Sequence, residues 1–142
     1  MYRSGCVLAS ALDIVGDKWS LIIIRDLFIE RTTFKEFLAG PEKIASNILS
    51  HRLKWLSVND IIKFMYSKGN KKVKHYYLTD KGINLYPTMV EMMKWGEEYL
   101  DNEYNEIAQN WLEATKNKSN KLIVKEEISQ YRKHKEKLLA TL

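Results

Sequence analysis

Apolar residues recur with helical periodicity along much of the chain, and the pattern is clearest at residues 43–56. Five apolar residues of this segment fall on one side of a helix: Ile44, Ile48, Leu49, Leu53 and Leu56. The spacing predicts a helix over residues 45–58 that packs one face against a core.

The other face of this predicted helix is polar and lacks any carboxylate. It carries Ser46, Asn47, Ser50, His51, Arg52 and Lys54. These side chains can bond phosphates and base edges, and a helix of this length fits the DNA major groove. The same pattern also fits an ordinary solvated helix face. The pattern of the remaining residues is needed to distinguish the two interpretations.

Three shorter helices are predicted before this segment. Residues 6–15 form an amphipathic pattern, residues 18–29 are apolar on most sides, and residues 32–37 begin a short helix. Thr33 followed by Glu36 is a capping box, and Gly40-Pro41 then breaks the helix. The order helix, short helix, loop, helix is that of a helix-turn-helix.

A β-hairpin is predicted directly after the polar helix. Residues 61–66 and 73–78 are rich in β-branched and aromatic side chains, and the turn at residues 67–72 contains glycine and asparagine. The turn carries Lys68, Lys71 and Lys72, and Lys74 follows it on the second strand. Such a hairpin is the wing of a winged helix, although a polar turn is also ordinary. The predicted fold is α+β and mostly α, a winged helix-turn-helix with a two-stranded wing.

The predicted wing is followed by a further helix, beginning at Asp80 with Thr79 as its N-cap and interrupted by Pro87. Its apolar stripe comprises Met89, Val90, Met92, Met93, Trp95, Tyr99 and Leu100. We expect a dimerisation helix that packs against residues 6–15 of a partner. The alternative is packing on its own domain.

Residues 1–104 are therefore expected to form one DNA-binding and dimerisation domain. Residues 105–142 form a helical extension with a polar break at residues 116–121. The extension fits a frayed helix, a partner-binding tail or an addition to the dimer interface, and the sequence does not select one.

Charge is concentrated in the middle of the chain. The net charge is +5, with 23 basic and 18 acidic residues. Residues 41–78 hold eight basic and two acidic residues, whereas the flanking thirds are close to neutral. A basic patch around the predicted recognition helix and wing is typical of phosphate binding.

The composition excludes several other classes of protein. An apolar content of 45% supports a real core, and no apolar run is long enough to span a membrane. No signal-peptide core follows the start, and one cysteine precludes an internal disulfide, so we expect a cytoplasmic protein. No metal-ligand spacing, phosphate loop or nucleophile–base pair is present, so neither a cofactor nor an enzyme activity is predicted.

At this point a family resemblance is clear. The chain resembles the HxlR family of bacterial winged helix-turn-helix transcription regulators, which are related to the MarR type. The matching stretches cover about residues 6–100: Cys6, ALDIVGDKW at 11–19, RDL at 25–27, FKEF at 34–37, LSHRLKWL at 49–56, YYLTDKG at 76–82, and Trp95-Gly96. The resemblance implies a homodimer on a pseudo-palindromic operator of double-stranded DNA.

The candidate DNA-binding residues are Thr33, Lys35, Ser46, Asn47, Ser50, His51, Arg52, Lys54, Lys68, Lys71, Lys72 and Lys74. Asn47 suits adenine, and the wing lysines suit phosphates, which set affinity rather than sequence preference. Arg52 has a second interpretation as an internal ion pair. His51 and His75 fit equally well as solvent-exposed residues without a role.

The chain departs from the family pattern at several positions. Val7 replaces the proline after Cys6, and Ala45 replaces a serine that would cap the recognition helix, a loss of about 1 kcal/mol unless Ser46 caps instead. Asp60 stands in place of a glycine, Lys71 and Lys72 replace the usual wing prolines, and the C-terminal tail is longer than usual.

Two inputs are candidates for regulation. Cys6 is expected at a helix N-terminus, where a thiol reacts more readily with oxidants, and the alternative is simple packing in the dimer interface. A small aromatic effector in a pocket between Trp19, Phe28, Trp95 and the methionine-rich helix is the second, with ordinary core packing as its alternative. A winged helix used only for protein contacts would carry an apolar or acidic wing, unlike this one.

Overall fold

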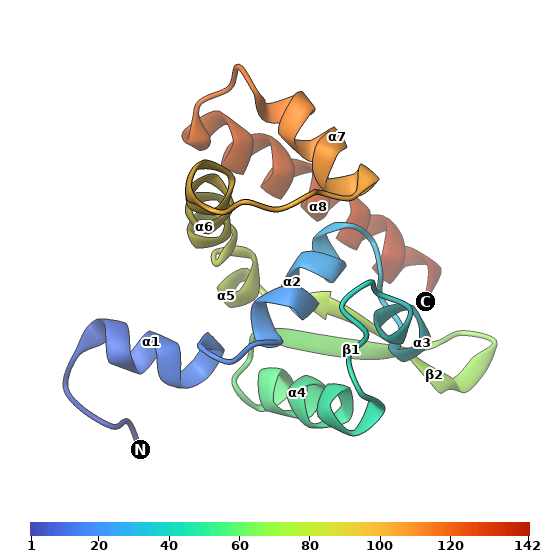
Figure 1. Cartoon of the computed structure of the whole chain (residues 1–142). Helices are drawn as coiled ribbons and strands as arrows, with labels where there is room; N and C mark the ends of the chain where they lie inside the picture. The colour runs from blue at the N-terminus through green and yellow to red at the C-terminus, as the bar shows by residue number, and fades with distance from the viewer.

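A computed structural model describes residues 1–142, and Figure 1 shows their arrangement. The elements in order are α1 (Val7–Val15), α2 (Ser20–Phe28), α3 (Phe34–Leu38), α4 (Ser46–Val58), β1 (Ile62–Ser67), β2 (Asn70–Leu78), α5 (Asp80–Ile83), α6 (Tyr86–Tyr99), α7 (Glu106–Thr115) and α8 (Asn120–Thr141). The predicted winged helix-turn-helix is confirmed. Helices α6–α8 lie on the opposite side of the hairpin from α4, and α1 projects away from the body (Figure 1).

Local side-chain caps explain where the helices before α4 begin. The carboxylate of Asp17 accepts the backbone N–H groups of Trp19 and Ser20, both at 2.9 Å, so α2 begins two residues later than predicted. The predicted capping box of α3 is confirmed, because Thr33 Oγ1 accepts the Glu36 N–H and the Glu36 carboxylate accepts the Thr33 N–H.

One hydrophobic core joins α2, α4, the hairpin and α6. Its fully buried side chains include Ile24 and Leu27 of α2, Leu49 and Leu56 of α4, Ile62, Leu78 and Val90. The predicted apolar stripe of α4 therefore packs inward at residues 49, 53 and 56. Ile48, at its edge, stays 38% exposed.

The hairpin is antiparallel and longer than predicted. Pairing runs from Ile62↔Leu78 to Tyr66↔Lys74 and, after an irregularity at Tyr66 and Ser67, ends at Ser67↔Asn70. The turn is therefore short, and the prediction that Lys71 and Lys72 lie within it is wrong. They lie on β2, whose start is shaped by the Asn70 side chain, which accepts the Lys72 N–H at 3.0 Å.

Two helices replace the single interrupted helix predicted after the hairpin. The predicted N-cap is confirmed, since Thr79 Oγ1 accepts the Gly82 N–H at 3.2 Å. Gly82 is required for close packing, because a Cβ there would lie 2.3 Å from the Ile61 carbonyl oxygen. Pro87 falls in the first turn of α6, where its missing N–H costs no helical hydrogen bond.

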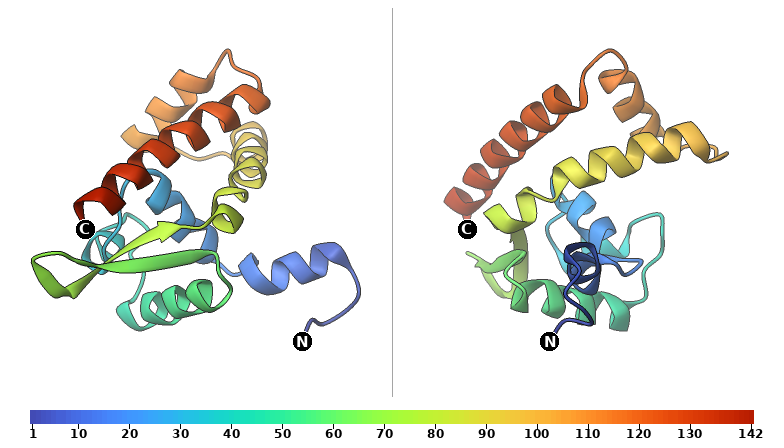
Figure 2. Two further views of the ribbon diagram at one scale, coloured as in Figure 1. Left: turned by 180° about the vertical axis from the view of Figure 1, so that it is seen from behind. Right: turned by 90° about the vertical axis from the view of Figure 1, so that its left-hand side faces the viewer.

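Helix α6 has an inner and an outer apolar face. Tyr86, Met89 and Val90 are buried within the molecule, whereas Met92 and Trp95 are 56% and 58% exposed. The inner face follows the alternative left open by the sequence, packing on its own domain, because α8 folds back against it (Figure 2). The outer face stays uncovered.

The C-terminal extension packs on the winged domain instead of forming a frayed or free tail. Tyr131 of α8 is 3% exposed, its hydroxyl accepts the backbone N–H of Leu78 at 2.8 Å, and its ring lies 4.9 Å from that of Phe28. Arg132 pairs with Asp80 at 2.8 Å. The end of β2 is thereby fixed by a residue far along the sequence.

We expect Tyr131→Phe to lower the free energy of unfolding by about 1–3 kcal/mol, because it leaves the buried Leu78 N–H without an acceptor. Urea unfolding at a fixed protein concentration measures this. Tyr104→Phe is the matched control, since its hydroxyl makes only a 3.4 Å hydrogen bond to Gly96. Equal effects of the two variants would contradict the assigned role of Tyr131.

Candidate nucleic-acid interface

The outward face of α4 presents a compact set of polar side chains. Five predicted residues are exposed on it, at positions that share one side of a helix: Ser46, Asn47, Ser50, His51 and Lys54. The helix contains no carboxylate, so nothing on it repels a phosphate. The buried leucines orient this face toward solvent, and it supplies hydroxyl, amide, imidazole and ammonium groups for base edges and backbone.

Arg52 differs from the other five residues. Its guanidinium lies 3.2 Å from the Asp17 carboxylate and 5.7 Å from the centre of the Trp55 ring, with 19% of the side chain exposed. Nη2 also lies 2.9 Å from His51 Nδ1. The structure thus shows Arg52 in the internal ion pair, the second of the interpretations left open by the sequence.

Helix α4 begins without a side-chain cap. Ala45 occupies the N-cap position in extended backbone conformation and makes no capping bond, and Ser46 lies inside the helix. The first N–H groups of α4 therefore have no side-chain acceptor, and such groups favour an anion. At the other end Asp60 has φ 57°, the left-handed conformation that its residue type tolerates.

The α3 candidates differ in availability. Thr33 Oγ1 is engaged with Glu36 in the capping box, so its hydroxyl is already bonded. The Lys35 side chain is exposed. Burial raises the pKa of the Glu36 carboxyl, but hydrogen bonds from Thr32 and Thr33 outweigh it and leave that pKa below its usual value.

The wing lysines are mostly free. Lys68, Lys71 and Lys72 are exposed and make no ion pair, whereas Lys74 is half-buried with Nζ 4.4 Å from the centre of the Phe64 ring. The hairpin turn projects beyond the body, and α4 lies at the edge of the molecule opposite the turn between α7 and α8 (Figure 2).

The hairpin is held against α3 by residues that sequence reasoning missed. The Tyr76 N–H donates to the Thr32 carbonyl at 2.8 Å, and Thr32 Oγ1 is hydrogen-bonded to His75 Nδ1 at 2.8 Å. Thr32 is buried and His75 half-buried, so His75 is not an exposed residue without contacts. No pattern in the neighbouring sequence predicts this long-range contact between Thr32 and His75.

Helix α1 is attached to α4 through its C-terminal end. Trp55 Nε1 donates to the Ile14 carbonyl at 2.9 Å, and the Arg52–Asp17 pair lies just beyond the end of α1. Cys6 is exposed at the N-cap of α1, where its Sγ accepts the Ala9 N–H at 3.5 Å. The predicted position of Cys6 at a helix N-terminus is confirmed.

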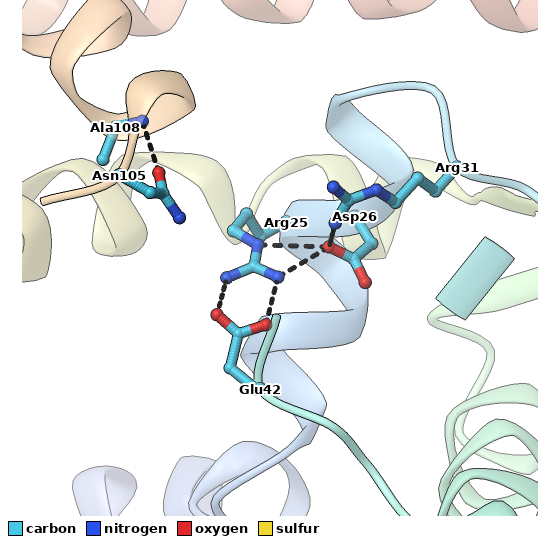
Figure 3. A network of polar contacts seen from close by, with 6 residues as sticks. All are labelled: Arg25, Asp26, Arg31, Glu42, Asn105 and Ala108. Carbon is cyan, nitrogen blue, oxygen red and sulfur yellow. Dashed lines mark hydrogen bonds and ion pairs between the residues drawn. The ribbon is translucent and has the colours of Figure 1, made fainter. Parts of the chain in front are cut away.

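A second attachment fixes the loop that leads into α4. Arg25 makes two hydrogen bonds to the Glu42 carboxylate, at 2.7 and 2.8 Å, and both Arg25 and Arg31 donate to the buried Asp26 (Figure 3). The bonds from Arg25 lower the pKa of the Glu42 carboxyl below its usual value, although partial burial opposes this. Glu42 lies four residues before α4 begins, so this network positions the start of α4.

Comparisons with known proteins agree with this geometry. The family model described as HxlR-like helix-turn-helix matches residues 14–104. The HTH-type transcriptional regulator YdeP of Bacillus subtilis is 35% identical over 98 residues, which cover 68% of this chain and 76% of YdeP. No helix combines the length and apolar character that a membrane span needs.

Solved structures show the same likeness. The crystal structure of PA1607 matches this structure with a TM-score of 0.65 at 35% sequence identity, and the match covers 73% of this chain and 72% of PA1607. That of the redox regulator HypR in its oxidised form has a TM-score of 0.61 at 28% identity, covering 68% of this chain and all of HypR. The chain belongs to the HxlR-like helix-turn-helix family and is a transcriptional regulator of that type.

Proposed function

We propose that this protein binds double-stranded DNA sequence-specifically, as a homodimer on a pseudo-palindromic operator in the bacterial cytoplasm. The observation that carries the proposal is the outward face of α4, which holds five exposed polar side chains and no carboxylate beside three exposed wing lysines. In each protomer α4 enters a major groove, and the hairpin contacts the adjacent backbone.

The exposed side chains divide into base and phosphate contacts. The Asn47 amide fits the paired donor and acceptor of adenine, and Ser46 and Ser50 bond a base or a phosphate. The wing lysines contact phosphates, which add affinity without sequence preference. Arg52 acts through its ion pair with Asp17, by holding α4 in place, rather than by touching DNA.

The uncovered apolar faces support dimerisation. Helix α1 buries none of its residues, and Val7 and Leu8 are 86% and 67% exposed. The outer face of α6 exposes Met92, Trp95 and Tyr99. Burying such faces against a second copy removes apolar surface from water at about 25 cal/mol per Å², and a two-fold arrangement matches a pseudo-palindrome.

The wing assignment predicts a change in salt dependence. Lys71→Ala with Lys72→Ala should weaken binding to all DNA sequences and flatten the plot of log affinity against log salt by about one per lost phosphate contact. Fluorescence anisotropy with duplex DNA at several salt concentrations measures the slope.

The control removes the same charge elsewhere. Lys116→Ala with Lys121→Ala changes two exposed lysines near the turn between α7 and α8, at the edge of the molecule opposite α4. It should leave the slope close to that of the unchanged protein. A slope equally altered by both pairs, or by neither, would show that the hairpin does not contact DNA.

The recognition assignment predicts a change in base preference. Asn47→Ala should cost about 1–3 kcal/mol on the operator and much less on unrelated DNA, because one paired base contact is lost. Selection from a randomised duplex library shows the effect as relaxed preference at one position in each half-site. Uniform weakening on every sequence would assign Asn47 to the backbone instead.

We further propose that Cys6 is the thiol through which an oxidant alters DNA binding. It is exposed, and α1, which it caps, is attached to α4 through Trp55. With one cysteine per chain, oxidation yields a disulfide between protomers or with a small thiol. Each such disulfide releases two protons and gives two electrons to the oxidant. HypR, the redox regulator of similar fold, supports this assignment.

Cys6→Ser should abolish any response of DNA binding to diamide while leaving the affinity of the reduced protein unchanged. The measurement is a gel-shift titration with and without the oxidant, repeated after thiol reduction. The mutation preserves size and the capping position. Loss of DNA binding under diamide in the serine variant would remove Cys6 from the switch.

A further inference from the structure

A cavity of about 490 Å³ lies between α2, α6 and α7. It is within the size range of sites for drug-sized molecules. The C-terminal extension forms one side of it, since α7 and Glu127 of α8 supply part of the lining. The aromatic pocket expected from sequence is therefore only partly right. Phe28 and the methionine-rich helix do line the cavity, but Trp19 and Trp95 do not.

One wall of the cavity is aromatic and polarisable. The rings of Phe28 and Tyr86 lie 4.4 Å apart, and Trp111 Nε1 donates to the Tyr86 hydroxyl at 3.3 Å. Met89 and Met93 continue this wall along α6. Aromatic faces carry negative electrostatic potential and attract cations, including quaternary ammonium groups.

The charges of the cavity are unbalanced. Its two basic residues, Arg25 and Arg31, are already paired with Glu42 and Asp26 (Figure 3). Three further carboxylates line it: Glu97, Glu103 and Glu127. None of the three makes an ion pair or a side-chain hydrogen bond in the structure.

Glu127 differs from the other two carboxylates because its side chain is partly buried. Burial, with a smaller effect of neighbouring Glu126, raises the pKa of its carboxyl above the usual value, although the charge of Lys118 opposes this. Glu127 and Tyr86 line the same cavity, and burial raises the pKa of Tyr86 to about 12, with the charge of Glu127 adding to that rise. A partly buried carboxylate without a partner is costly and is relieved by a bound cation.

We propose that this cavity binds an organic cation with an aromatic or otherwise apolar body. The apolar body packs on Phe28, Tyr86, Trp111 and the methionines, and the positive charge faces Glu127. An anionic ligand of the same shape is rejected, because the arginines that would attract it are neutralised by their own partners.

The cavity is lined in part by the loop that leads into α4, so a bound ligand can affect the position of α4. Pro41 and Glu42 line the cavity, and α4 begins at Ser46. A ligand against them bears on the Arg25–Glu42 pair, which positions the loop before α4. The cation is thus an effector of DNA binding, a consequence that rests on the proposed function, whereas the binding site itself does not.

The test compares two ions of matched shape and opposite charge. Calorimetric titration of the full-length protein in sodium buffer uses tetraphenylphosphonium and tetraphenylborate, with no DNA present. Tetraphenylphosphonium should bind saturably, at one ion per chain, and tetraphenylborate should bind at least tenfold more weakly, about the effect of one charge contact in a partly buried site. Equal or tighter binding of the anion, or no binding of the cation, would overturn the proposal.

Two variants locate the site. Glu127→Gln should weaken tetraphenylphosphonium binding about tenfold, while Glu98→Gln, which alters an exposed carboxylate of α6 outside the cavity, should not. If Glu127→Gln is unstable, the double variant Glu97→Gln with Glu103→Gln, at two exposed positions, provides a second test. It should also weaken the binding of tetraphenylphosphonium. Unchanged affinity in a folded Glu127→Gln protein would place the cation elsewhere, such as on the outer face of α6.

Gel-shift titrations keep this inference distinct from the proposed function. With DNA from the region beside its own gene, tetraphenylphosphonium should change the operator affinity of the unchanged protein and of Glu98→Gln, but not of Glu127→Gln at the same ion concentration. DNA binding without cation binding would reject the cavity proposal and leave the function standing. Cation binding without DNA binding would reject the proposed function and leave the cavity proposal standing.

Discussion

The burial of one side of α4 is the constraint on which the rest of the structure depends. Leu49, Leu53 and Leu56 are at most 2% exposed, and withdrawing them from the core would cost several kcal/mol. Their burial leaves the helix one orientation, in which Asn47 and its polar neighbours face outward. The hairpin and α3 pack against α4 and, with the rest of the core, cover these leucines.

Contacts at both ends fix this orientation. At its start, the Arg25–Glu42 pair holds the preceding loop, and toward its end Trp55 bonds the last turn of α1. These two attachments connect α4 to the two proposed inputs, the cavity in one case and Cys6 in the other. On these proposals, a ligand and an oxidant act through separate parts of one helix.

Features set by neighbouring residues could be predicted from the sequence. The capping box of α3, the Thr79 cap, the α4 stripe and the existence of the hairpin all follow from spacing over a few positions. The length of the hairpin turn was missed, because cross-strand pairing rather than turn composition determined it.

Features that join distant residues could not be predicted in this way. An internal ion pair was one of two interpretations of Arg52, but its partner Asp17 was not predicted. The Thr32–His75 bond and the docking of Tyr131 on Leu78 likewise depend on a fold already formed. The extension gave no strong signal, since α8 buries only Ile123 and Tyr131 of its 22 residues. The cavity was predicted only in part, from Phe28 and the methionines of α6, because α7 and α8 supply the rest of its lining.

The most direct test of sequence-specific DNA binding is an anisotropy titration of the unchanged, reduced protein on duplex DNA from the region beside its own gene. An unrelated duplex of equal length serves as competitor, and stoichiometry is determined at protein concentrations above the dissociation constant. We expect saturable, salt-sensitive binding of two chains per site that resists the competitor. Equal affinity for both duplexes, or no binding at low salt, would contradict it.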